Sequence, residues 1–440
     1  MDSTASEVLE LIVENDVKFI RLNFCDMFGL QKSISIMADE LNNAFDTGVS
    51  FDAHAVSGFR DVTESDLFLF PEPSTLTVLP WRPGSGRVAS FFCDIRKPDG
   101  SQFLHDGRGL LKQVADRALK MGYVCKIGAE CEFYLFLTND SGEPTNTVFD
   151  KGGYLDVPPL DKGEDIRREI CLTLEEMGIK PETSHHEQGP GQNEINFRFG
   201  DVLSCADNFL TFKSAVKTIA ARNGLFASFM PKPLLQAPGN GLHMNLSLSQ
   251  NGSNVFINAN QGHSSVAESF IAGILDKTAQ ITLFLNPITN SYERFGQFEA
   301  PKYVSWSHQN RSQLIRIPAA ASDEKVRMEL RSPDPSINPY LAFAMVLSAG
   351  LDGIENKLLL PPAVDADLYT ASESVTSMLT RLPEDLESAI TLAENSTFVK
   401  RILDPVHLSR YLSVKKAEAA GYAAAIDKNR FYTERYFPSV

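Results

Sequence analysis

Gly128-Ala129-Glu130-Cys131-Glu132-Phe133-Tyr134-Leu135-Phe136 is the stretch of this 440-residue chain from which its fold can be read. Apolar and acidic residues alternate along it, as they do in a β-strand whose successive side chains point to opposite faces. Two carboxylates on one face of a mostly apolar strand are costly to bury unless a positive group meets them. Taken alone, the segment is better explained by a strand whose two glutamates face solvent.

Three further segments repeat this alternation and change that interpretation. Each carries polar or charged side chains on one face and apolar side chains on the other. Any one of them could be an ordinary amphipathic strand, but four such strands, rich in Glu and Arg and poor in Lys, are better explained as parts of one site. The polar faces are Glu194, Asn196 and Arg198 within 193–199; His243, Asn245 and Ser247 within 242–249; and Arg327, Glu329 and Arg331 within 326–331.

The acidic residues of these segments form a candidate metal-ligand set. Glu187 joins them, because the Gly189-Pro190-Gly191 break forbids a helix and bends the chain so that Glu187 approaches Glu194. A ligand set dominated by oxygen atoms suits Mg²⁺ or Mn²⁺, whereas structural zinc would need thiolates. The number of ligands predicts two ions. His185 and His186 are interpreted as packed or supporting residues. The predicted ligands are Glu130, Glu132, Glu187, Glu194, His243 and Glu329.

Four arginines lie within 21 residues of one another, mostly between apolar neighbours: Arg311, Arg316, Arg327 and Arg331. A single arginine is usually part of a surface ion pair. Guanidinium groups, however, grip carboxylates and phosphates in a fork. A carboxylate-lined site with divalent cations and arginines is typical of phosphoryl transfer, where catalysis is mainly positioning and charge neutralisation.

Composition limits the class of protein. The chain is 43% hydrophobic and 22% charged, as expected for an ordinary globular protein, and its net charge of -15 argues against a nucleic-acid partner. Six scattered cysteines without a C-x-x-C pair, an N-terminus unlike a signal peptide and no long apolar run predict a cytoplasmic protein away from membranes. G-x-G-x-x-G and P-loop motifs are missing, so a nucleotide would be held in another way.

Helical and strand patterns mix without strict βαβ alternation, which predicts an α+β fold. The turn-rich segment 96–101 is the best candidate boundary between two domains. We therefore expect an N-terminal domain over residues 1–100 and a larger domain over 101–440.

With these residues in place, the sequence resembles class I glutamine synthetase. The matching motifs follow the family order over roughly residues 15–360, and a chance match of so many is negligible. They are Phe51-Asp52, Gly128-x-Glu130-x-Glu132, Gly152-Gly153-Tyr154, His186-Glu187 with Gly191-Gln192-Asn193-Glu194, Phe229-Met230-Pro231-Lys232-Pro233, Gly241-x-His243, Asn290-Ser291-Tyr292-x-Arg294, Glu299-Ala300-Pro301, Asn310-Arg311-Ser312, Ile315-Arg316-Ile317-Pro318, Arg327-x-Glu329-x-Arg331 and Asn338-Pro339-Tyr340.

The resemblance implies an architecture. It predicts a small β-grasp-like N-terminal domain and a catalytic domain with a curved antiparallel sheet flanked by helices. It also implies a homo-oligomer, a dodecamer of two stacked hexameric rings with active sites between neighbouring subunits.

The resemblance further implies roles for individual residues. Glu132, Glu187 and Glu194 would hold one metal ion, and Glu130, His243 and Glu329 the other. Asp52, supplied by the adjacent subunit, would share an ammonium pocket with Tyr154 and Glu187. Glu299 would lie on a loop that closes over the intermediate. Substrate residues would be Tyr154, Gly239, Arg294, Arg311 and Arg331, and ATP residues Phe199, Asn245, Ser247, Arg316 and Arg327.

The implied reaction has two steps. ATP phosphorylates the γ-carboxylate of glutamate, and ammonia then displaces phosphate to give glutamine. Asp52 would take the proton from ammonium as general base, while Glu299 and Arg311 complete the catalytic group. Closure of the loop would keep water from the acyl phosphate.

Three departures from the family pattern fall around the amino-acid and amine pockets. Ala53-His54-Ala55 replaces the usual Gly-Ser-Ser after Asp52, Pro238 stands where an asparagine is expected, and the loop 294–299 is one residue shorter. They suit a γ-glutamyl-amine ligase acting on methylamine, ethanolamine or a polyamine. A glutamine synthetase is favoured because Asp52 and the rest of the ammonium pocket remain. A non-catalytic relative is a third possibility, against which the complete ligand set argues.

Overall fold

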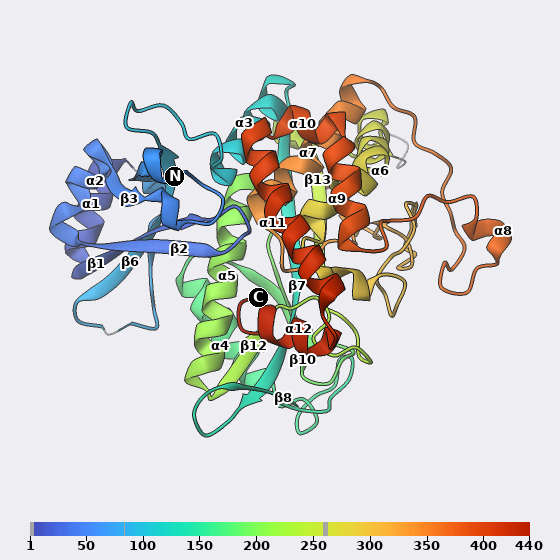
Figure 1. The fold of residues 1–440 in the computed structure, drawn as a ribbon, viewed down its shortest axis with the longest axis horizontal. Coiled ribbons are helices and arrows are strands. Elements are labelled where there is room, and N and C mark those ends of the chain that lie inside the picture. The colour runs from blue at the N-terminus through green and yellow to red at the C-terminus, as the bar shows by residue number, and fades with distance from the viewer. Residues whose placement is uncertain (1–3, 83, 258–262) are drawn as a thin grey trace.

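The computed structural model describes residues 4–82, 84–257 and 263–440, which form a small N-terminal unit and a larger catalytic unit (Figure 1). The N-terminal sheet has the order β2-β1-β6-β4-β3, with β5 beside β6. β1 and β6 run parallel, and Ile20, Leu22 and Phe91 on them are fully buried. The elements are α1 Ala5–Glu14, β1 Val17–Cys25, β2 Gln31–Met37, α2 Leu41–Thr47, β3 Val49–Asp52, β4 Asp66–Pro71, β5 Thr77–Val78 and β6 Arg87–Arg96.

The catalytic sheet is built around β7 (Val124–Thr138), which contains the stretch that begins at Gly128. Its order is β15-β16-β17-β13-β7-β10-β9; β8, β11 and β12 also pair with β7, and β14 pairs with β13. The other strands are β8 Pro144–Val148, β9 Pro181–His186, β10 Gln192–Phe197, β11 Gly200–Asp201, β12 Leu225–Ser228, β13 Leu242–Gln250, β14 Ser253–Asn254, β15 Trp306–His308, β16 Ile315–Ile317 and β17 Met328–Leu330.

The predicted α+β class is confirmed, with a small N-terminal sheet and a larger sheet flanked by helices, but the larger sheet is mixed, not wholly antiparallel. β15 and β16 run parallel to each other, since a loop after β15 carries the chain back before β16 begins. The strand expected over 326–331 is shorter than its alternation suggested. It pairs only over Met328–Leu330, so Arg327 and Arg331 flank the strand.

Helices cover the apolar face of this sheet. Ala129, Cys131, Phe133 and Leu135 are at most 1% exposed, and α3 and α5 pack on their strand. α7 is apolar all round, as a helix in the interior must be. α11 packs against α9, and Figure 1 shows these two helices side by side. The helices are α3 Gly107–Lys120, α4 Glu164–Glu176, α5 Val202–Arg222, α6 Ser265–Leu285, α7 Pro339–Glu355, α8 Glu373–Thr376, α9 Leu386–Asn395, α10 Thr397–Ile402, α11 Pro405–Ala424 and α12 Lys428–Arg435.

None of the described helices is long and apolar enough to cross a membrane.

A buried ion pair ties the two units together. Arg108, at the start of α3, donates from Nε and Nη2 to Asp207 on α5 and from Nη1 to Asp94 on β6. The hydroxyl of Tyr340 donates to Asp207 at 2.5 Å. Because Arg108 is 3% exposed, its charge depends on these two carboxylates.

We predict that Asp207→Ala lowers the free energy of unfolding by roughly 3 kcal/mol, since it leaves a buried guanidinium with only Asp94 as partner. The measurement is the midpoint of urea unfolding. Asp116→Ala, on the exposed face of α3, is the matched control and should leave the midpoint unchanged. Equal midpoints for both variants would show that the pair does not support the fold.

Candidate active site

The register of four strands brings five of the six predicted ligands close together. On one side of β7, His243 of β13 lies opposite Glu130. On the other side, Glu194 of β10 lies opposite Glu132. β17 continues the pattern, because Glu329 is paired with Asn245 on β13. Alternation along each strand then directs these side chains to the same face of the sheet.

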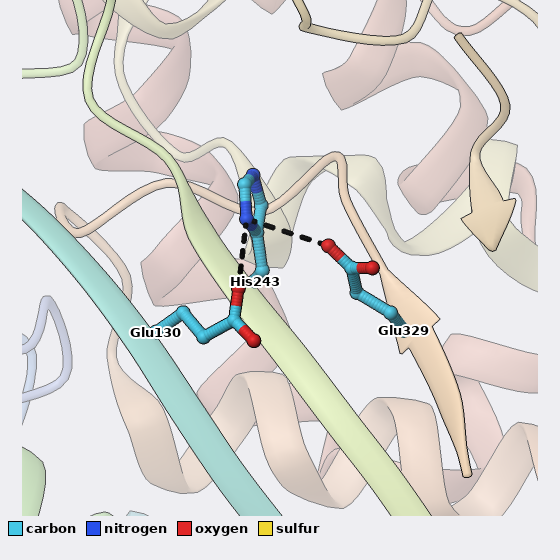
Figure 2. A group of neighbouring side chains, drawn as sticks. All are labelled: Glu130, His243 and Glu329. Carbon is cyan, nitrogen blue, oxygen red and sulfur yellow. Dashed lines mark ion pairs between the residues drawn. The ribbon is translucent and has the colours of Figure 1, made fainter. Parts of the chain in front are cut away.

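Glu130, His243 and Glu329 form the first acidic group (Figure 2). The Nδ1 atom of His243 lies 3.5 Å from Glu130 Oε2 and 3.5 Å from Glu329 Oε1. Figure 2 shows the two carboxylates, from different strands, converging on the same side of the imidazole. One ligand atom of each residue lies within 4.8 Å of the others, a spacing at which they could hold one cation.

A second acidic group lies along the same cavity and contains Glu132, Glu187 and Glu194. Glu132 Oε2 accepts hydrogen bonds from the Gly241 N–H at 2.8 Å and from Gln192 Nε2 at 3.0 Å. Glu187 and Glu194 lie close enough to hold a cation together with His185.

The two glutamates of β7 meet opposite electrostatic surroundings. Burial raises the pKa of Glu130, but hydrogen bonding and charge from His243, together with Asn245, lower it to about 2. Burial and then the charges of Glu187 and Glu194 raise the pKa of Glu132 well above its usual value.

Glu194 behaves like Glu132. Burial, followed by the charges of Glu130 and Glu187, raises its pKa to about 8. Glu329 does not share this rise: its burial is outweighed by Arg331 and His243, so its pKa is lowered. The second group is therefore the one in which negative charges face each other without enough positive charge from the protein.

Hard, oxygen-rich donors and mutual repulsion fit divalent cations such as Mg²⁺ or Mn²⁺. Two such groups could hold two ions, and their occupancy stays a prediction. A third acidic group, Asp150, Asp161 and His186, is different, since Arg167 already pairs with Asp161 at 2.5 Å and His186 Nε2 lies 2.8 Å from Asp150.

Arginines line the rest of this cavity, which has a volume of about 650 Å³. Arg331 is fully buried and donates from Nη1 to Glu329 Oε1 at 2.5 Å, while Arg316 pairs with the other oxygen of Glu329. Arg294 is also buried and donates to the carbonyl of Ser332 at 2.9 Å. Arg311 is exposed at the rim. These four arginines form a cationic wall in the same cavity as the acidic groups, and Arg316 and Arg331 contact the first group directly through Glu329. Such a wall suits the binding of an anionic substrate.

An adjoining cavity of about 320 Å³ contains the remaining predicted nucleotide residues: Phe199, Asn245, Ser247 and Arg327. Arg327 Nε donates to Asn245 Oδ1 at 2.7 Å, and Asn245 Nδ2 donates to Glu130 Oε1 at 2.8 Å. Phe199 is half exposed and its ring faces Lys126 at 5.3 Å. Glu130 and Arg327 line both cavities, which therefore meet at the first acidic group.

The structure brings Tyr154, Gly239 and Glu299 to the larger cavity. A Cβ on Gly239 would lie 2.5 Å from both Arg294 Cγ and the carbonyl of Pro231, so this position requires glycine. Asp52 is the exception. It is exposed at the end of β3 in the N-terminal unit, where it caps His54, and it does not line the cavity of its own chain.

Sequence reasoning interpreted His185 only as a packed or supporting residue and missed Gln192 and Gln188, and all three contact the predicted site. His185 Nε2 lies 3.0 Å from Glu187 Oε1, so it belongs with the second acidic group. Gln192 bonds Glu132, and it could have been found because it precedes Glu194 by two residues on the same strand face. Gln188 donates to Glu299 Oε1 at 3.2 Å, a contact across 111 residues with no sequence signal.

Comparison with known protein families agrees with this geometry. The family described as glutamine synthetase, catalytic domain matches residues 104–434, and the glutamine synthetase beta-Grasp domain matches residues 16–98. The chain belongs to the glutamine synthetase family. It is 44% identical over 428 residues to glutamine synthetase of Clostridium saccharobutylicum and 46% identical over 429 residues to that of Methanosarcina mazei, in each case over 96% of both chains.

Solved structures give the same family. The chain resembles GmaS in its ADP complex with a TM-score of 0.87 and 30% identity, over 99% of both chains. It resembles GmaS without ligand with a TM-score of 0.86 and 31% identity, over 98% of this chain and 99% of the other. This member of the glutamine synthetase family is therefore an ATP-dependent ligase that forms carbon–nitrogen bonds.

Cation binding to the second acidic group should depend on pH. With its pKa raised from 4.5 to about 8, Glu194 binds a proton in the folded state that it loses in the unfolded state, so the metal-free protein should lose stability as pH rises through this window. Below about pH 8 a cation must displace that proton. We predict that the rise in melting temperature caused by Mn²⁺ is larger at about pH 9 than at about pH 6.

The control is Glu194→Gln, which removes the titrating carboxyl and should flatten this dependence. A rise in melting temperature that is equal at both pH values, or larger at low pH, would contradict the assignment.

Proposed function

We propose that this ligase joins ammonia to the γ-carboxylate of L-glutamate through a γ-glutamyl phosphate, giving glutamine, ADP and phosphate. The observation that carries the proposal is the meeting of the two cavities at Glu130 and Arg327. A nucleotide in the smaller cavity would direct its γ-phosphate toward the arginine-lined cavity, where a bound carboxylate would be in reach. Closeness and charge neutralisation are what phosphoryl transfer requires.

In the first step the cationic wall would bind and orient the substrates. Arg294 and Gly239 form the part of the wall that would receive the amino acid, and Arg316, Arg327 and Arg331 would face the phosphates. Divalent cations held by the two acidic groups would neutralise charge on the transferring phosphoryl group. The pairs that Arg316 and Arg331 make with Glu329 keep these guanidinium groups fixed before substrate arrives.

In the second step an amine must lose a proton and attack the acyl phosphate. Tyr154, whose ring packs edge-on against His185 with centroids 5.6 Å apart, and Glu187 would form the amine pocket. Asp52 cannot serve the cavity of its own chain, so we propose that a neighbouring subunit supplies it as general base. This requires a homo-oligomer, for which the proposed arrangement is a dodecamer of two hexameric rings. The proposed location is the cytoplasm.

A second candidate is a γ-glutamyl-amine ligase, and specific observations favour it. GmaS, at a TM-score of 0.87, is a γ-glutamylmethylamide synthetase. Pro238 replaces the asparagine expected at the glutamate site, and its carbonyl accepts a hydrogen bond from Tyr134 at 2.7 Å. Ala53 is buried where the family has glycine. Ammonia remains the first proposal, because the three residues of the expected ammonium pocket are all present: Asp52, Tyr154 and Glu187.

The test is ATP-dependent phosphate release with glutamate and ammonium, then with methylamine, ethanolamine and putrescine in its place, in Mg²⁺ and in Mn²⁺. We expect the highest kcat/KM with ammonium and loss of activity in Glu329→Ala, with Asp116→Ala as control. Activity with an alkylamine alone would replace this proposal by the amine-ligase one. No release with any donor would favour a non-catalytic relative.

A further inference from the structure

Lys232 is a buried cation for which neither acidic group accounts. It follows β12 in the segment Phe229-Met230-Pro231-Lys232 and is 1% exposed. Its backbone is fixed by Asn290, which accepts from the Lys232 N–H at 2.7 Å and donates to its carbonyl at 3.1 Å. Its Nζ atom, however, makes no hydrogen bond to any described residue. Burying an ammonium group without a hydrogen-bond partner costs free energy, so another contact must account for its position.

The contact that this ammonium does make is with an aromatic ring. Nζ lies 4.6 Å from the centroid of the Phe298 ring, within the range of a cation–π interaction. Phe298 belongs to the loop 295–300, where its φ of +49° is one that bulky residues seldom adopt. A strained conformation persists when surrounding contacts determine it.

The same loop carries Glu299, and the cavity holds Glu299 from the other side. Gln188 Nε2 donates to Glu299 Oε1 at 3.2 Å, and Arg331 Nη2 donates to the Glu299 carbonyl at 3.2 Å. The loop is therefore held at two adjacent residues. Phe298 rests on a buried cation beneath it, and Glu299 is bonded across the cavity.

The charge of Lys232 does not serve stability. Burial and the nearby Arg294 guanidinium lower its pKa to about 8, which means that the folded protein pays to keep the ammonium charged. A methionine would fill similar space without this cost. The useful property of lysine here is its attraction to the ring.

We propose that Lys232 is a positioning residue that holds the loop 295–300 over the cavity through Phe298, and so excludes water from the acyl phosphate. The second half of this inference rests on the proposed function. If the loop opens, water attacks the acyl carbon, the bond to the phosphate oxygen breaks, and glutamate and phosphate leave without amide formation. Lys232 then sets how tightly ATP cleavage is coupled to amide formation.

The first experiment needs no substrate. Hydrogen–deuterium exchange of the full chain should show the amides of Gly296, Gln297 and Ala300, which donate hydrogen bonds to carbonyls of residues 294–300, exchanging roughly tenfold faster in Lys232→Met than in the parent. Phe298→Leu should have the same effect, and the double variant no more than either alone. Lys120→Met, at the exposed end of α3, is the control. The melting temperature of Lys232→Met should not fall.

The second experiment counts phosphate released per amide formed. Lys232→Met should raise this ratio several-fold above the parent, with a smaller effect on the KM for ATP. Unchanged exchange in the loop, or a lower melting temperature with exchange faster throughout the protein, would show that Lys232 does not hold the loop through Phe298, even if amide is formed normally. Faster loop exchange in a protein that forms no amide would support the positioning role of Lys232 and contradict the proposed reaction.

Discussion

Repulsion between buried carboxylates is the constraint on which this structure depends. The pairing of β7 with β10 places Glu132 opposite Glu194, and Glu187 joins them from the bend between β9 and β10. Burial and mutual charge raise the pKa values of Glu132 and Glu194. The protein keeps these groups together at a cost that only a cation can offset, and the apolar face beneath them gives the sheet the rigidity to do so.

The sheet provides the cation groups, and the connecting segments provide the substrate pockets. Strand register fixes five of the six predicted ligands, and Glu187 and Arg331 directly follow the ends of β9 and β17; the five are Glu130, Glu132, Glu194, His243 and Glu329. Arg294, Glu299 and Lys232 come from connecting segments, where the amino-acid and amine pockets are formed. The departures from the family pattern at Ala53, Pro238 and the loop 294–299 all lie in such segments. A change of nitrogen donor can therefore be accommodated without disturbing the cation groups.

The sequence predicted the faces of the strands but not how the strands are paired. Alternation placed Glu130 and Glu132 on one polar face, yet their opposite pKa shifts depend on having His243 across one and Glu194 across the other, and register is a property of tertiary structure. The same limit explains the contacts that sequence reasoning did not find. His185 lies opposite Glu194 in the β9–β10 pairing, and Lys232 meets Phe298 across 66 positions, where the sequence carries no periodic signal.

The most direct test of the account is anomalous diffraction from crystals of the protein grown with Mn²⁺. The account predicts two separate peaks, one among Glu130, His243 and Glu329 and one among Glu132, Glu187 and Glu194. A single peak between the two groups, or manganese bound only at Asp150, Asp161 and His186, would contradict the claim that the register of β7 builds two cation sites.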